Sequence, residues 1–196
     1  MTNVWQHHMA AMILENDTSK TREIEDSSDA ELLRQFRAGN KEALRLILRR
    51  YESSVIGYLT NYTKDPDHAR DLTQETFLRL IKYPPKAVKG DSLRPWIFSV
   101  ARNLAHDSWR KRKHTVELEQ APEACSENPG TRLHRLDAKH LLATLSDDLR
   151  DVVTLRIYGE LKFNEIAEQL NIPLGTALWR MRHAMEKLKH QLENRD

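Results

Sequence analysis

The sequence predicts an all-α protein made of two small helical domains joined by a flexible linker. Residues that break helices are scarce, with six glycines and seven prolines among 196 residues, and apolar residues recur at helical spacing along most of the chain. Residues 115–131 lack this periodicity and contain Pro122, Pro129 and Gly130, so we place the linker there. No segment has a convincing strand pattern.

These patterns divide the chain into four parts. Residues 1–27 form an N-terminal extension, and residues 28–114 and 132–196 form domains on either side of the acidic linker at 115–131. The extension lacks the basic start of a signal peptide, and no apolar run approaches the roughly 18 residues that span a bilayer. The single cysteine, Cys125, excludes an intrachain disulfide. We therefore expect a cytoplasmic protein without membrane insertion.

The first domain opens with two helices that have clear boundaries. Asp29 begins the first helix, and Gly39 can end it. Asn40 can cap the second helix, which is the clearest in the chain. Its apolar residues follow i, i+3, i+4, i+7 spacing, namely Leu44, Ile47, Leu48, Tyr51, Val55, Tyr58, Leu59 and Tyr62.

A third helix follows Asp65, an N-cap residue with a proline behind it at the first helical position. Its polar face carries Asp71, Gln74, Glu75 and Arg79. The Pro-Pro pair and the glycine of residues 82–92 predict a loop. Ser92 can cap a fourth helix, in which Trp96 is better interpreted as a core residue.

Charge is distributed unevenly, although the formal net charge is only +2. Residues 93–115 carry six lysines and arginines against Asp107 alone. Residues 116–130 carry four glutamates and no lysine or arginine. A basic helix that runs into an acidic segment is a local asymmetry that the total charge hides.

The second domain contains the pattern of a helix-turn-helix in residues 161–188. This motif needs a small residue where its helices cross and an apolar residue in the turn, and Ala167 and Ile172 meet these needs. The inward stripe of the second helix is expected to be Leu174, Ala177, Met181, Ala184 and Leu188. The remaining surface of that helix carries Thr176, Leu178, Trp179, Arg180, Arg182, His183 and Lys187.

The pattern alone leaves two interpretations of this helix open. A recognition helix would place Thr176 and the free N–H groups of the helix start at a phosphate. It would place Arg180 and Arg182 at base edges or phosphates. An ordinary amphipathic helix would only expose a solvated charged face. Trp179 favours the first interpretation, because a large aromatic side chain on a polar face needs a partner.

Three motif blocks resemble the sigma factors of bacterial RNA polymerase. Residues 148–188 are similar to the DNA-binding region four, residues 67–82 (DHARDLTQETFLRLIK) to region two, and residues 94–112 (RPWIFSVARNLAHDSWRKR) to its promoter-melting helix. Their order and the single linker resemble the two-domain extracytoplasmic-function type over residues 29–192. Three ordered blocks are more specific than a lone helix-turn-helix.

The resemblance implies a dissociable initiation factor without a cofactor, a metal or catalytic residues. The implied partners are core RNA polymerase, through its β′ clamp helices and its β flap, promoter DNA, and an anti-sigma factor. The residues matched to core-polymerase binding are Asp71, Gln74, Glu75 and Phe77. Acceptor groups at this spacing suit arginines of a partner helix, although without the resemblance we would interpret this face as merely solvated.

The resemblance also implies which residues contact DNA. The loop at 82–92 would hold a flipped base of the −10 element, and the residues assigned to −10 binding are Lys89, Arg94, Arg102, Asn103 and Arg110. The duplex −35 element would be contacted by Thr176, Leu178, Trp179, Arg180, Arg182, His183 and Lys187. Binding of unpaired bases would drive strand opening, since the sequence has no phosphate-cradling glycine loop.

The sequence departs from the family pattern at several positions. Val88 and Lys89 precede the Gly-Asp-Ser sequence where relatives often have an aromatic residue, so a stacking platform is missing. Lys162 replaces the serine or threonine that usually caps the first helix of the motif. Leu178 and Trp179 replace polar residues of the recognition helix, so no −35 sequence preference can be transferred.

Two other classes of protein give different expectations. A helix-turn-helix regulator with an N-terminal dimerisation or sensor domain predicts a stable homodimer on palindromic DNA, but it gives no reason for the block at 94–112. An enzyme is disfavoured because the nine histidines form no H-x-x-x-H or H-E-x-x-H pattern and no nucleophile elbow is present. His7 and His8 are adjacent, so they would point apart on a helix rather than share a metal.

Overall fold

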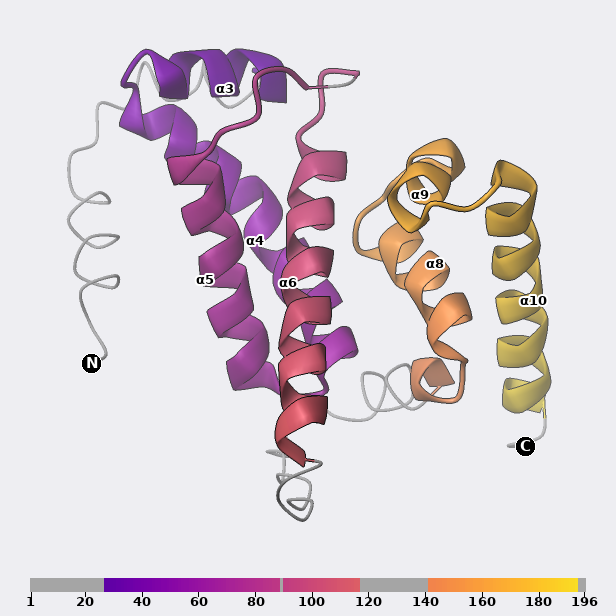
Figure 1. The fold of residues 1–196 in the computed structure, drawn as a ribbon. Coiled ribbons are helices and arrows are strands. Elements are labelled where there is room, and N and C mark those ends of the chain that lie inside the picture. Colours follow the sequence, from indigo (N-terminus) through magenta and orange to yellow (C-terminus); the bar gives the residue numbers. More distant parts are fainter. Residues whose placement is uncertain (1–26, 89, 117–140, 194–196) are drawn as a thin grey trace. The chain divides into compact units, whose positions relative to one another are not determined.

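The computed structural model describes residues 27–88, 90–116 and 141–193. Its regular elements are the helices α3 (Asp29–Arg37), α4 (Lys41–Thr63), α5 (Pro66–Lys82), α6 (Arg94–Val116), α8 (Asp147–Ile157), α9 (Phe163–Leu170) and α10 (Leu174–Glu193) (Figure 1). The predicted all-helical class is therefore confirmed. Most of the predicted extension and linker, together with Lys89, lies outside the described residues.

The chain forms two compact units that do not follow the order of the sequence. One unit comprises residues 1–51 and 84–93, and the other comprises residues 52–83 and 94–196. The long helix α4 contributes its first half to one unit and its second half to the other. Each unit therefore combines two segments that are separated in the sequence.

Local capping chemistry defines the helices of the first unit. The Ser28 hydroxyl accepts a hydrogen bond from the Glu31 N–H at 3.3 Å and caps the start of α3. Gly39 follows the end of α3 with φ of +93°, a conformation that favours glycine. The Asn40 side chain then accepts from the N–H of Glu42 at 3.0 Å. The predicted boundaries at Gly39 and Asn40 are confirmed.

In the second unit, α5 and α6 pack against each other (Figure 1). The Asp65 carboxylate caps α5 by accepting from the N–H groups of Asp67 and His68, both at 3.1 Å. Pro66 occupies the first helical position, where its missing N–H costs no intrahelical bond. The buried side chains of the two helices are Ala69, Leu72, Thr73, Thr76, Phe77 and Leu80 of α5, and Ile97, Phe98, Ala101, Leu104 and Ala105 of α6.

The helices α8, α9 and α10 pack on one another within the same unit. Their core is a cluster of Leu142, Leu145, Leu149, Val153 and Ala184, against which Met181 and Leu188 pack. Asn171 ends α9 in the left-handed conformation with φ of 52°, and the Ile172 N–H donates to the Ala167 carbonyl at 3.0 Å. This tight turn sets α10 against α9 and forms the predicted helix-turn-helix.

The expected inward stripe of α10 is only partly correct. Ala177 and Ala184 are fully buried, whereas Leu174 is 48% exposed. Leu174 is the first residue of α10, so it precedes the part of the helix that is covered. Among the described residues, no helix is long and apolar enough to cross a membrane, and no cluster of His, Cys, Asp and Glu could hold a metal ion.

Candidate nucleic-acid and polymerase interfaces

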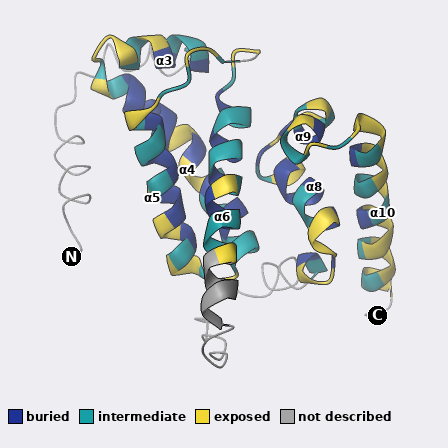
Figure 2. Ribbon diagram, in the orientation of Figure 1, coloured by how far each residue is buried: buried dark blue, intermediate teal, exposed yellow. Residues whose placement is uncertain are grey.

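Much of α10 is exposed to solvent (Figure 2), and its exposed residues include aromatic and basic ones. Leu178 and Trp179 are 45% and 58% exposed, and Arg182 and Lys187 are exposed as well. The Trp179 ring stacks on the ring of His183, with centroids 5.1 Å apart and planes 13° apart. The stacking holds the indole in one orientation, so α10 offers an ordered apolar surface between cationic side chains.

The Arg180 side chain is less available for contact with DNA than the sequence suggests. Its guanidinium forms an ion pair with the Asp148 carboxylate of α8 at 2.9 Å, and the Arg180 side chain is only 18% exposed. Arg180 therefore lies on the flank of α10 that faces α8, and not at the centre of the exposed side. Thr176 in the first turn of α10 is half-buried. Contact between Arg180 and DNA requires the guanidinium to leave Asp148 or to bridge both groups.

The polar face of α5 is open at the positions that the resemblance assigns to polymerase binding. Asp71 and Gln74 are exposed. Glu75 is half-exposed and pairs with Arg79 one turn later at 3.2 Å. Phe77, which we also assigned to this face, is 4% exposed. The Phe77 side chain lies in the core because it falls on the apolar stripe of α5, so it packs beneath the exposed polar residues.

The residues assigned to −10 binding occupy different environments on α6. Asn103 is exposed, and the Arg110 side chain is 81% exposed and pairs with Asp107 at 3.1 Å. Trp96 is half-buried, which agrees with a packing role more than with a stacking platform. Asn103 can therefore meet DNA without rearrangement, and Arg110 is well exposed although it pairs with Asp107. Lys89 lies outside the described residues.

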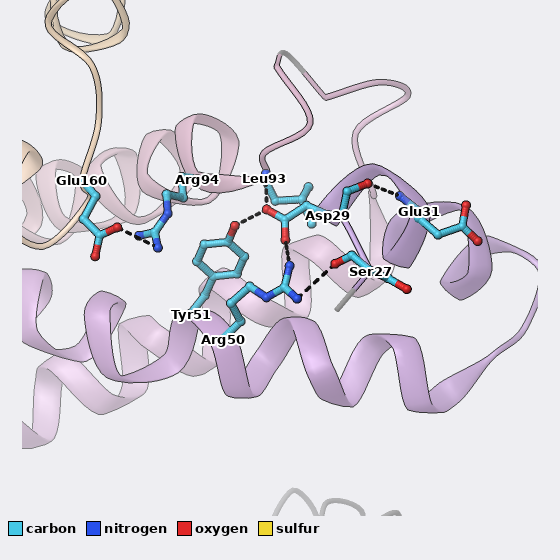
Figure 3. A network of polar contacts seen from close by, with 9 residues as sticks. Ser27, Asp29, Glu31, Arg50, Tyr51, Leu93, Arg94 and Glu160 are labelled. Carbon is cyan, nitrogen blue, oxygen red and sulfur yellow. Dashed lines mark hydrogen bonds and ion pairs between the residues drawn. The ribbon is translucent and has the colours of Figure 1, made fainter. Parts of the chain in front are cut away.

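The other two arginines of this set are less exposed than Arg110, and they also pair with carboxylates. The Arg102 guanidinium lies 3.5 Å from the Asp151 carboxylate, and that of Arg94 lies 2.9 Å from Glu160 (Figure 3). Burial raises the pKa of the Asp151 carboxyl, and the charge of Arg102 opposes this rise. Contact of either arginine with DNA requires its ion pair to open.

Three residues that the sequence did not single out as functional also make contacts at these surfaces. Asp148 holds Arg180. Asp29 and Arg37 of α3 contact the segment between α5 and α6. Asp148 and Arg37 had no distinguishing sequence signal, because both belong to ordinary charged helical turns. Asp29 was recognised only as the start of a helix, and its partners are 21, 22 and 64 residues away.

Comparison with known proteins identifies two regions of a known family in this chain. Residues 47–115 match the family model of sigma-70 region 2, and residues 141–190 match that of sigma-70 region 4. The sigma factor CarQ of Myxococcus xanthus is 29% identical over 168 residues, which cover 82% of this chain and 95% of CarQ. The extracytoplasmic-function sigma-E factor of Haemophilus influenzae is 26% identical and covers 86% of this chain and 97% of its own length.

Two solved structures have the same fold. The sigma factor RpoE of Bartonella quintana, solved with the anti-sigma factor NepR, superposes with a TM-score of 0.67 at 23% identity, over 76% of this chain and 96% of RpoE. CnrH, solved with the cytosolic domain of CnrY, gives a TM-score of 0.65 at 21% identity, over 87% of this chain and all of CnrH.

The chain belongs to the RNA polymerase sigma factors, in the two-domain extracytoplasmic-function group, and directs promoter-specific initiation of transcription.

Proposed function

We propose that α5 docks on the β′ clamp helices of core polymerase, that α6 and the segment before it capture the −10 element, and that α10 contacts the −35 duplex. The observation that carries this proposal is the order of three surfaces in one chain. They are an exposed acceptor face on α5, exposed polar and basic side chains on α6, and an exposed aromatic and basic face on α10. A dimeric regulator needs the last surface but not the first two.

The acceptor face of α5 suits a basic partner helix. Asp71, Gln74 and Glu75 lie about one turn apart, and Asp71 and Gln74 are exposed while Glu75 is half-exposed. Arginines of a partner helix can form charge-assisted hydrogen bonds with such carboxylates, and these bonds are stronger than neutral ones. Phe77 contributes by anchoring the apolar side of α5 in the core, which leaves the acceptor side of the helix facing outward.

DNA binding requires side chains on α6 that contact unpaired bases and side chains on α10 that contact duplex DNA. Asn103 can donate to and accept from the edge of a flipped base, and Arg110 can contact the backbone. On α10, Trp179 and Leu178 offer apolar surface for thymine methyl groups, while Arg182 and Lys187 contact phosphates. Strand capture itself provides the free energy for opening, so the mechanism needs neither nucleotide hydrolysis nor a catalytic residue.

A regulatory partner and a cellular location complete the proposal. The relatives RpoE and CnrH were solved with NepR and with CnrY, so we propose that an anti-sigma factor also binds this chain. Core polymerase and promoter DNA are cytoplasmic, and we place this chain in the cytoplasm with them. The β flap is the proposed contact of the helix-turn-helix part on polymerase.

Reversing charge on α5 tests the docking surface. The double variant Asp71→Arg and Glu75→Arg should lose copurification with core polymerase, because like charges would then face the basic partner helix. Asp71 is exposed and the Glu75 side chain is 46% exposed, so the fold should persist, and circular dichroism checks this. The matched control is Glu52→Arg on α4, another exposed glutamate. Unchanged binding by the double variant, or equal loss in the control, would refute this docking surface.

A further inference from the structure

Residues 84–93, within the segment between α5 and α6, are attached to α3 near both of their ends. All of these residues belong to one compact unit. Under the function proposed above, this segment (the −10 loop) holds a flipped promoter base. Its shape when no DNA is bound therefore matters for how readily it captures that base.

Asp29 anchors the end of the −10 loop (Figure 3). This residue is only 3% exposed. Its carboxylate accepts the Leu93 N–H at 2.7 Å, the Arg50 guanidinium at 2.6 Å and the Tyr51 hydroxyl. A buried charge is tolerated where it is paired and hydrogen-bonded. Leu93 is fully buried and directly precedes α6 in the sequence, so this network fixes the position of the last residue of the loop.

Arg37 anchors the beginning of the same loop. Its guanidinium donates to the carbonyl of Lys86 at 3.0 Å, to that of Pro84 at 3.5 Å, and to that of Pro85. The planar fork of five donors lets one arginine hold several carbonyls of a turn together. Asp29 and Arg37 lie at opposite ends of α3, so a single short helix sets the separation of the loop's two ends.

The backbone of the loop itself needs this support. Gly90 and the following Asp91 both have positive φ, +58° and +56°. For Asp91, which has a Cβ, this conformation is disfavoured and persists only where the surroundings enforce it. The anchors at residues 84–86 and at Leu93 lie on either side of this pair. Without them, the loop would sample other shapes.

We propose that Asp29 and Arg37 are positioning residues that hold the −10 loop in the shape that accepts a flipped base, and so determine −10 base discrimination. Neither residue needs to contact DNA. Ligand affinity falls in proportion to the fraction of protein in the competent shape. If losing one anchor reduces that fraction to about a tenth, capture of the −10 strand weakens about tenfold. Duplex −35 binding and polymerase docking use other surfaces and stay unchanged.

The test compares holoenzymes carrying Asp29→Asn, Arg37→Ala or the control Glu31→Gln. Glu31 is also on α3, but its carboxylate accepts from Arg34 and Gln35 of the same helix. Each holoenzyme is titrated with a labelled single-stranded non-template oligonucleotide that carries the −10 element of a promoter transcribed by the wild type. A second oligonucleotide set has one −10 base substituted at a time.

We expect Asp29→Asn and Arg37→Ala to bind the intact −10 strand about tenfold more weakly and to discriminate less between it and the substituted strands. Glu31→Gln should match the wild type, and all variants should bind core polymerase equally. Arg37 is exposed, so its replacement should not unfold the unit even if Asp29→Asn does. Unchanged discrimination in Arg37→Ala would overturn the proposal. Lack of −10 discrimination by the wild type would instead refute the proposed function.

Discussion

Replacing Asp148 with asparagine should tighten promoter binding by freeing Arg180. In the structure, the Asp148 carboxylate accepts from the Arg180 guanidinium at 2.9 Å and lies beside the proposed recognition helix. DNA must compete with this carboxylate for Arg180, and the carboxylate also repels phosphates. Both effects act in the same direction, so removing the charge with an isosteric amide should favour the DNA complex.

The expected gain follows from the exposure of the pair. Exposed ion pairs contribute about 0.2–1 kcal/mol. The Asp148 side chain is 71% exposed but that of Arg180 is only 18% exposed, which places this pair toward the upper end of the range. Releasing Arg180 should therefore tighten binding by up to about 1 kcal/mol, or about fivefold.

Fluorescence anisotropy of holoenzyme on a labelled −35 duplex measures this change at fixed salt concentration. Asp147→Asn is the matched control, because Asp147 is adjacent but pairs with Arg150 at 2.8 Å. In an Arg180→Ala background, Asp148→Asn should give a smaller gain, as a double-mutant cycle would detect. Weaker or unchanged binding by Asp148→Asn would refute the reasoning, and so would an equal gain from Asp147→Asn.

Two further predictions concern the start of α9 and the exposed face of α6. Lys162 occupies the N-cap of α9, where its ammonium cannot accept a hydrogen bond, and only the Glu165 carboxylate closes the turn, from the Lys162 N–H at 2.7 Å. Lys162→Ser should stabilise α9 by about 1 kcal/mol, seen as slower amide exchange in α9; no gain over Lys162→Ala would contradict this. Asn103→Ala should reduce permanganate reactivity of the −10 region and leave −35 duplex affinity unchanged; full reactivity would remove Asn103 from the proposed site.

The sequence predicted the helices well because their boundaries depend on local chemistry. The Asp65-Pro66 start of α5, the Gly39 end of α3 and the Asn40 cap of α4 each involve residues within a few positions of one another. Periodicity likewise placed Ala177 and Ala184 on the buried side of α10. Contacts of this kind depend little on the rest of the fold.

The sequence could not predict which charged groups are already paired. Arg180 and Asp148 are separated by 32 residues, and Asp29 and Leu93 by 64. Periodicity places a residue on a face of its helix but does not say which neighbouring element covers that face. Phe77 was matched to the docking residues by the resemblance, yet its side chain lies on the apolar stripe of α5 and is buried.

Reconstituted transcription most directly tests whether this chain acts as a sigma factor with two promoter contacts. Purified core polymerase is mixed with the chain and a genomic promoter library, and the run-off transcripts are sequenced. We expect core polymerase to initiate at defined sites only when the chain is present, with two shared elements upstream of those sites. Absence of transcripts that depend on the chain, with binding of the chain to palindromic DNA as a homodimer without polymerase, would contradict its assignment as a sigma factor.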